Sequence, residues 1–192
     1  MLRANQKLVR AFIAVDANDT NIIGKIENII DYLKSFNIKM KFVETDNLHI
    51  TLRFLGEISE SDVEIIKENI INKLKCNSFN IDLKGVGAFP SPENPRVIWV
   101  GIVNGFEMLK SIKKEIDEML IKNGFKINYE EFIPHLTIAR IKFGKSNSLS
   151  KFLNEYKDID IGSININSIK LKKSTLTKNG PIYNNLAEAL CK

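Results

Sequence analysis

Two short stretches of this chain repeat one another, and this repeat limits the possible folds more than any other feature. Residues 47–52 (NLHITL) resemble residues 133–138 (IPHLTI), and their histidines stand 86 positions apart. Both stretches follow a helix-then-strand pattern. Repeats of long period usually mark duplicated structural units. Two copies are too few for a solenoid, so the sequence predicts a pair of pseudo-symmetric lobes.

Hydrophobic periodicity predicts a mixture of strands and helices. Short apolar runs rich in β-branched residues indicate strands, and apolar residues at helical spacing indicate helices. We expect strands near residues 8–16, 38–43, 49–55 (closed by Gly56), 79–89, 96–103, 134–143, 164–176 and 182–187. We expect helices over about 20–36, after a capping box of Ser61 and Glu64, over 109–120 before Gly124, and over 149–156. Strands and helices thus alternate along the whole chain.

The length and composition indicate one globular unit. A chain of 192 residues suits one compact domain of two lobes, so we expect residues 1–192 to form a single domain with one histidine motif per lobe. No apolar run approaches the roughly 20 residues of a membrane span. The first seven residues lead into a strand without a secretory signal. We therefore expect a cytoplasmic protein that does not bind membranes.

The two cysteines and the basic residues bear on possible partners. Cys76 and Cys191 lie outside any CxxC pair, and thiols stay reduced in the cytoplasm, so we expect reduced thiols and no zinc site. The net charge of +5 favours anionic partners such as RNA. Arginine is scarce beside lysine, yet Arg53, Arg96 and Arg140 lie in or next to the segments discussed below. We interpret the lysine-rich run 170–173 as a solvated strand face.

The only two histidines each begin the pattern His, apolar, Thr, apolar. Because side chains alternate along a strand, His49 and Thr51 should share one face, and His135 and Thr137 should do the same. A lone histidine on a strand is more often structural. Here, however, every histidine of the chain falls in the pattern, which favours a catalytic interpretation.

Two such faces across a cleft could hydrolyse a cyclic phosphodiester. In-line displacement needs a base for the water, an acid for the leaving oxygen, and donors for the charged oxygens. Histidine titrates near pH 6.5, so one neutral and one protonated imidazole coexist near neutrality. The hydroxyls of Thr51 and Thr137 could bind the non-bridging oxygens. This chemistry needs neither a metal nor a cofactor.

Longer strings around the motifs resemble a known family. The resemblance runs through residues 8–15, 47–56, 87–90, 95–101 and 134–140 in order, over nearly the whole chain. These strings are similar to those of the RNA 2′,3′-cyclic phosphodiesterase branch, also called 2′-5′ RNA ligase, of the two-histidine phosphoesterase superfamily.

The resemblance implies a fold and roles for residues. The implied fold is a bilobal, pseudo-symmetric α+β fold, with two antiparallel sheets flanked by helices and a central cleft. His49 would be the proton donor and His135 the proton acceptor. The implied substrates are RNAs with 2′,3′-cyclic phosphate ends, tRNA halves among them, and the product is a 2′-phosphate. The reverse reaction would join a cyclic end to a 5′-hydroxyl without ATP. We favour a monomer.

Four further side chains are candidates for substrate contact. Alternation places Arg53 on the catalytic face, whereas Arg140 falls on the opposite face unless a bulge re-aims it or it acts from a neighbouring layer. Arg96 follows a proline-rich loop and could bind substrate or pin that loop. Phe12 could stack on a base or belong to the core.

Two other functions remain open from the sequence. A protein of this fold could bind a nucleotide or an RNA end without turning it over, although binding alone needs no acid–base pair. A metallohydrolase would need more ligands than two histidines, and no HxxE or CxxC motif supplies them. Turnover assays and chelation distinguish these alternatives.

Overall fold

The computed structural model describes residues 7–128, 131–144, 146–178 and 180–192 and confirms the α+β class. The α-helices are α1 (Thr20–Lys34), α2 (Glu60–Asn69), α3 (Phe106–Lys122) and α4 (Asn147–Glu155), and 3-10 turns cover Thr45–Asn47 and Ile71–Lys73. The strands are β1 (Leu8–Asp16), β2 (Lys39–Phe42), β3 (His49–Ser59), β4 (Phe79–Phe89), β5 (Val97–Asn104), β6 (His135–Phe143), β7 (Asp160–Ile166), β8 (Ser168–Leu176) and β9 (Pro181–Leu190). Among these described elements, no helix is both long and apolar enough to cross a membrane.

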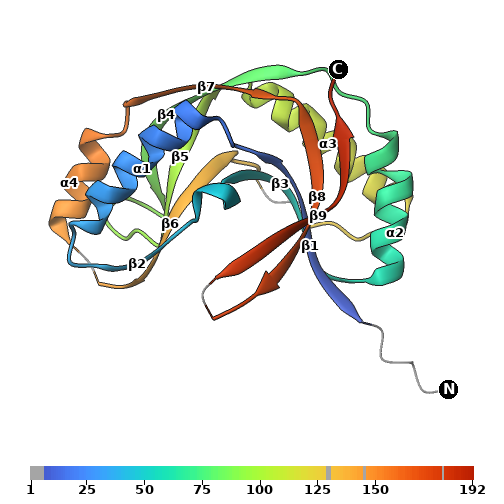
Figure 1. Cartoon of the computed structure of the whole chain (residues 1–192), viewed down its shortest axis with the longest axis horizontal. Helices are drawn as coiled ribbons and strands as arrows, with labels where there is room; N and C mark the ends of the chain where they lie inside the picture. The colour runs from blue at the N-terminus through green and yellow to red at the C-terminus, as the bar shows by residue number, and fades with distance from the viewer. Residues whose placement is uncertain (1–6, 129–130, 145, 179) are drawn as a thin grey trace.

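The strands form one curled antiparallel sheet, in the order β7-β4-β5-β6-β3-β1-β8-β9, with β2 also on β6 (Figure 1). The prediction of two separate sheets is therefore wrong. One half of the sheet consists of β7, β4, β5 and β6, and the other of β3, β1, β8 and β9. The two halves are joined by a single register pair of β3 and β6, Ile50 with Leu136. Farther along the same edge of β6, β2 takes the place of β3 and pairs with residues 139–143. The two halves therefore meet at one residue pair only. Sequence periodicity cannot reveal this connection.

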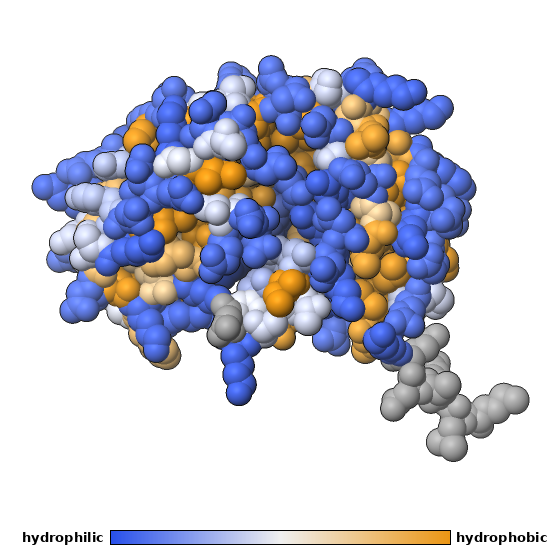
Figure 2. Space-filling view, in the orientation of Figure 1, coloured by the Kyte–Doolittle hydropathy of each residue, from blue (hydrophilic) through white to orange (hydrophobic). Residues whose placement is uncertain are grey.

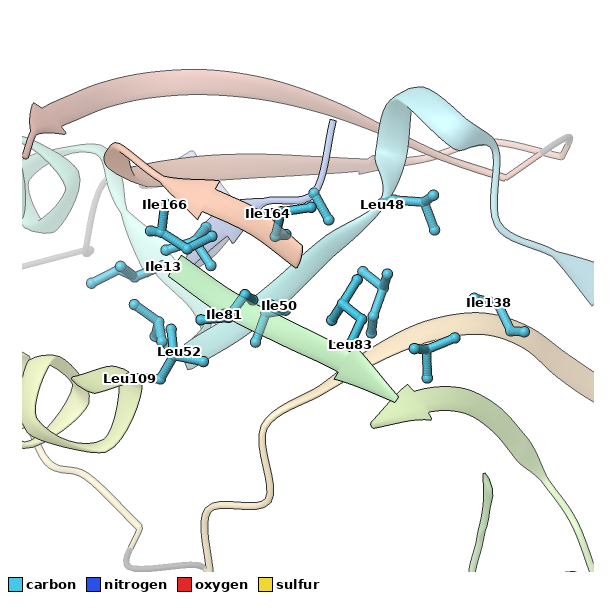
Figure 3. Close-up of a cluster of buried hydrophobic side chains, with 14 of the residues drawn as sticks. Ile13, Leu48, Ile50, Leu52, Ile81, Leu83, Leu109, Ile138, Ile164 and Ile166 are labelled. Atoms are coloured by element: carbon cyan, nitrogen blue, oxygen red, sulfur yellow. The ribbon is translucent and has the colours of Figure 1, made fainter. Parts of the chain in front are cut away.

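The helices cover one face of this sheet and leave the other face for the site. α1 contacts β6 and β7, α4 contacts β4, α2 contacts β1 and β3, and α3 contacts β3 and β5. Apolar side chains from the sheet fill the space beneath the helices, among them Ile13, Ile50 and Ile81, each fully buried (Figure 3). On the face seen in Figure 2, hydrophilic side chains predominate and hydrophobic ones show between them, as the charge of the chain suggests.

The helix caps agree only partly with the sequence analysis. Asp19 caps α1, because its carboxylate accepts hydrogen bonds from the N–H groups of Asn21 and Ile22. The capping box of α2, however, is formed by Ser59 and Asp62 instead of Ser61 and Glu64. β3 continues through Gly56, which adopts a φ of 73°, and ends only at Ser59. The glycine thus bends the strand without ending it, and the helix begins two residues earlier than expected.

A disulfide joins Cys76 to Cys191, so the prediction of reduced thiols is wrong. The chain end runs beside the segment that enters β4. There the Ser78 N–H donates to the Lys192 carbonyl at 2.8 Å, and the Lys192 N–H donates to the Cys76 carbonyl at 3.0 Å. The bond spans 115 residues of sequence. No local pattern indicates that segments so far apart meet, and the argument from a reducing compartment pointed the wrong way.

Candidate active site

The pairing of β3 with β6 brings the two motifs together. Ile50 and Leu136 are register partners and fully buried. In an antiparallel pair, the residues on either side of such a pair face each other and share the opposite face of the sheet. Continuing the register by one residue places His49 opposite Thr137, and Thr51 opposite His135. All four side chains are half-buried, on the face that the helices leave uncovered.

Both imidazoles are held in the same way. Nδ1 of His49 lies 2.6 Å from the carbonyl oxygen of Asn47, and Nδ1 of His135 lies 2.7 Å from that of Ile133. A carbonyl can only accept a hydrogen bond, so Nδ1 carries the proton in each ring. Nε2 is then the nitrogen that gains or loses a proton in each ring. This arrangement suits an acid–base pair, because it fixes both the tautomer and the ring orientation.

Aromatic rings fix His49 in place. The Phe12 and Tyr183 rings lie 4.9 Å and 5.1 Å from its imidazole, measured between centroids. Phe12 is only 3% exposed, so neighbouring side chains cover its ring. Stacking of a base on Phe12 remains a prediction, and this packing does not favour it. Burial raises the pKa of Tyr183, which keeps its hydroxyl protonated near neutrality. Sequence analysis missed Tyr183, since nothing local links it to His49.

His135 has a matching pair of rings. The Phe89 ring meets it edge-on at 5.0 Å, and the Trp99 ring lies 6.4 Å away, again between centroids. Phe89 and Trp99 also pack against each other at 5.1 Å. Both rings lie in strings that the family resemblance includes, but periodicity alone gives them no role. The two histidines therefore have pseudo-symmetric surroundings, as the internal repeat predicts.

A bulge in β6 turns Arg140 to the face of the sheet that carries His135 and Thr137. The partners of Ile98 and Trp99 on β6 are Ala139 and Thr137, so Ile138 is an extra residue. Ile138 and Ala139 are both buried, and the exposed Arg140 then shares the face of the catalytic motif. This is the re-aiming by a bulge that the sequence analysis left open.

The corresponding bulge in β3 has the opposite effect on Arg53. Ile13 and Ala14 of β1 pair with Arg53 and Thr51, so Leu52 is the extra residue. Arg53 turns toward α3, where Nε donates to Asp117 Oδ1 at 2.6 Å and Nη2 donates to Oδ2. The predicted placement of Arg53 on the catalytic face is therefore wrong, because strict alternation ignores the bulge. A contact between Arg53 and a phosphate remains a prediction, and the pairing of Arg53 with Asp117 argues against it.

The charge of Arg140 reaches both catalytic candidates. Burial lowers the pKa of His49 and that of His135, and the Arg140 guanidinium lowers both further. The hydrogen bonds from the Nδ1 atoms to backbone carbonyls oppose these effects. One cation that acts on both imidazoles must lie near both histidines. A contact between Arg140 and a substrate phosphate remains a prediction, for which a guanidinium is chemically suited.

A buried charged cluster lies beside His49 and corrects the interpretation of residues 170–173. Asp16, the register partner of His49, pairs with Lys170 at 2.8 Å and with Lys172 at 2.6 Å. The lysine side chains are only 14% and 7% exposed, so this strand face is not solvated. Burial alone would raise the pKa of Asp16, but the two lysines outweigh burial and lower it. Asp16 raises the pKa of His49, whereas Lys172 lowers it.

Arg96 takes part in holding the loop through its backbone. Its N–H donates to the Phe89 carbonyl at 2.6 Å, and its carbonyl accepts from the Ile141 N–H at 2.9 Å. The side chain is exposed, and contact with substrate remains a prediction. Within the residues that the structure describes, no group of three or more His, Cys, Asp or Glu side chains could hold a metal ion.

Comparison with known proteins identifies the family. The model of the family described as LigT like Phosphoesterase matches residues 18–99 and, a second time, residues 100–183. The chain belongs to the LigT-like phosphoesterase family. Each matched half contains one of the two histidine motifs, so the family model repeats where the sequence repeats.

Curated relatives of this LigT-like phosphoesterase align over most of the chain. An RNA 2′,3′-cyclic phosphodiesterase of Methanocaldococcus jannaschii is 43% identical and covers 94% of this chain and 99% of its own. One of Aeropyrum pernix is 42% identical and covers 87% and 95%. The crystal structure of E. coli LigT in its apo form superposes with a TM-score of 0.71 at 21% identity, covering 97% of this chain and 99% of the other. The last comparison supports the fold alone.

Proposed function

We propose that this LigT-like phosphoesterase is an RNA 2′,3′-cyclic phosphodiesterase, with residues 1–192 acting as one catalytic domain. The observation that carries the proposal is the pair of imidazoles on one face of neighbouring strands, each with Nδ1 bonded to a carbonyl and Nε2 left for the substrate. The names of the curated relatives support this substrate class. A binding module would need no such acid–base pair, so the geometry favours turnover.

The proposed mechanism is an in-line displacement at phosphorus. The neutral imidazole of His135 takes a proton from the attacking water, and the protonated imidazole of His49 gives a proton to the departing 3′-oxygen. Thr51 and Thr137 donate their hydroxyls to the non-bridging oxygens, and Arg140 balances the developing charge. The phosphate then remains on the 2′-oxygen.

The proposed substrates are RNAs that end in a 2′,3′-cyclic phosphate, including tRNA halves. An RNA substrate agrees with the basic net charge of +5 and with the cytoplasmic location expected from the sequence. In the reverse direction, a 5′-hydroxyl takes the place of water and a 2′-5′ linkage forms without ATP, because the cyclic ester already stores the energy of the new bond.

The proposal is tested by turnover in the presence of a chelator. We expect hydrolysis of 2′,3′-cyclic AMP and of a cyclic-ended oligonucleotide to continue in excess EDTA, because hydroxyls and a guanidinium provide the charge stabilisation that a cation would otherwise supply. Loss of activity on chelation, restored by one divalent ion, would instead support a metallohydrolase. Tight binding without turnover of either substrate would support the binding module.

The pH profile provides a second test. Burial and Arg140 lower the pKa of both histidines below 6.5 in the free protein. Activity falls at low pH as the base gains a proton, and at high pH as the acid loses one. We therefore expect kcat/KM to trace a bell centred on the acid side of pH 6.5, whose limbs belong to the coupled pair.

The variant Arg140→Gln should move this bell. Without the cation, both pKa values rise, so the maximum of kcat/KM shifts to higher pH. Its height should fall by about 10²-fold, as expected when one donor to transition-state charge is lost. Lys142→Gln removes the same charge from the same strand and should leave the profile in place. If the maximum of kcat/KM for Arg140→Gln stays at the wild-type pH, Arg140 does not act on the two histidines.

A further inference from the structure

A pocket lies beside Trp99, whose ring is 6.4 Å from that of His135 between centroids, and the hydrolysis described above does not use it. Its volume is about 420 Å³, and residues of β4, β5 and the end of α4 line it. Gly87 and Gly101 form part of the lining beside the indole of Trp99. A Cβ on Gly87 would lie 2.3 Å from that indole, and a Cβ on Gly101 would lie 2.7 Å from the Lys84 carbonyl. Neither position has room for a side chain, because the indole of Trp99 lies over Gly87 and the backbone of β4 lies close to Gly101.

The pocket begins beside the proposed base. Gly101 is the register partner of His135, and Trp99 is the partner of Thr137. The next strand continues the same row, because Lys84 is the partner of Gly101. Across the sheet from His135, the neighbouring positions are therefore Gly101 on β5 and then Lys84 on β4. The indole of Trp99 and the exposed Lys157 of the segment after α4 complete the surroundings.

We propose that this pocket binds the nucleoside that carries the attacking 5′-hydroxyl of a second RNA, and so serves the ligation direction. The inference rests on the proposed function, which places the cyclic end with its 3′-oxygen at His49. In-line attack requires the nucleophile on the opposite side of phosphorus, at His135. The pocket adjoins His135, so it lies on the side of the incoming group.

The chemistry of the lining fits such a ligand. The volume lies within the range of about 300–1,000 Å³ that is usual for ligand pockets. An indole stacks on any base without sequence preference. Lys84 and Lys157 are exposed cations at positions where the phosphates of an RNA strand would run. An apolar ring, two glycines and two cations together suit the end of a single-stranded RNA.

The proposed step is balanced. The 5′-hydroxyl oxygen bonds to phosphorus while the bond from phosphorus to the 3′-oxygen breaks. The hydroxyl proton passes to His135, and the proton of His49 passes to the 3′-oxygen. The product is a 2′-5′ phosphodiester with a free 3′-hydroxyl, and no nucleoside triphosphate is consumed.

Fluorescence tests occupancy of the pocket directly, because Trp99 is the only tryptophan in the sequence. The probe is the dinucleotide ApA with a 5′-hydroxyl. We expect a saturable change in Trp99 emission that persists when 2′-AMP fills the cyclic-end site. The double variant Lys84→Glu, Lys157→Glu should weaken the apparent affinity by roughly twofold to tenfold, since reversing an exposed charge has a modest effect. Emission that does not respond to ApA, or complete competition by 2′-AMP, would overturn the assignment.

Ligation provides a functional readout. A 2′,3′-cyclic-ended RNA is mixed with a 5′-hydroxyl RNA, and the ratio of ligated to hydrolysed product is measured. The ratio should fall roughly twofold to tenfold in the same double variant, and it should stay at the wild-type value in Lys114→Glu, Lys122→Glu, where two exposed lysines of α3 are reversed. An unchanged ratio, or no ligated product from the wild type, would overturn the acceptor pocket. Absence of hydrolysis in the wild type would instead overturn the proposed function.

Discussion

Replacing either histidine by alanine should lower kcat/KM for 2′,3′-cyclic AMP by about 10²–10⁴-fold, the usual effect of losing a general acid or base. The two imidazoles act on the two sides of one phosphorus atom. We therefore expect His49→Ala, His135→Ala and the double variant to have similar residual rates, because groups that act as a unit are not additive. Steady-state kinetics at the wild-type pH optimum measure this effect.

Folding must be shown to survive these changes. The His135 side chain is half-buried and lies on the face of the sheet opposite that of the buried Leu136, so its removal leaves the core intact. His49 packs on Phe12 and Tyr183, and His49→Asn, which keeps a polar side chain there, serves as a second variant. Thermal melts should remain cooperative in each variant. Turnover at the wild-type rate by a folded variant of either histidine would refute two-histidine catalysis.

Removing the disulfide should have the largest effect on stability. The bond between Cys76 and Cys191 closes a loop of 115 residues, and the loss of unfolded-chain entropy for a loop near 100 residues is about 4.7 kcal/mol. This is a large part of the roughly 5–15 kcal/mol that stabilises a typical domain. For Cys76→Ser, Cys191→Ser we expect a fall in melting temperature of about 10–20 °C, given about 2–4 °C per kcal/mol at this chain length.

A reductant provides the matched control. Dithiothreitol should lower the melting temperature of the wild type toward that of the double variant and leave the double variant unchanged. The rate constants of the two proteins should agree well below their melting temperatures, because the bond joins the chain end to the start of β4 and none of the proposed catalytic residues takes part in it. Equal melting temperatures without reductant, or two free thiols in the purified wild type, would contradict the prediction.

The sequence predicts the bounds of a strand well where the apolar pattern lies within that strand. β1 and β4 have the predicted bounds, 8–16 and 79–89, because each is a short apolar run with clear ends. The joining of the halves into one sheet depends on the pairing of Ile50 with Leu136, and the disulfide depends on the meeting of distant segments. Pairings between distant segments leave no periodic pattern, so the sequence predicted neither.

The site shows the same division between local and distant information. The motif itself indicates His49, Thr51, His135 and Thr137, since residue type and alternation are local properties. Alternation fails for the two arginines, because one extra residue in each strand reverses their faces and exchanges the places predicted for Arg53 and Arg140. Tyr183 and the buried pairs of Asp16 come from strands that approach His49 only in the folded chain.

The position of the phosphate in the product tests the central claim most directly. A cyclic-ended RNA is hydrolysed to completion, and the terminal nucleotide is identified by phosphorus NMR or by chromatography against 2′- and 3′-phosphate standards. If His49 protonates the 3′-oxygen while His135 activates the water opposite it, every product end carries a 2′-phosphate and a free 3′-hydroxyl. A 3′-phosphate product would show that the leaving oxygen lies at the other end of the cleft, and would contradict the assigned roles even if both histidines proved essential.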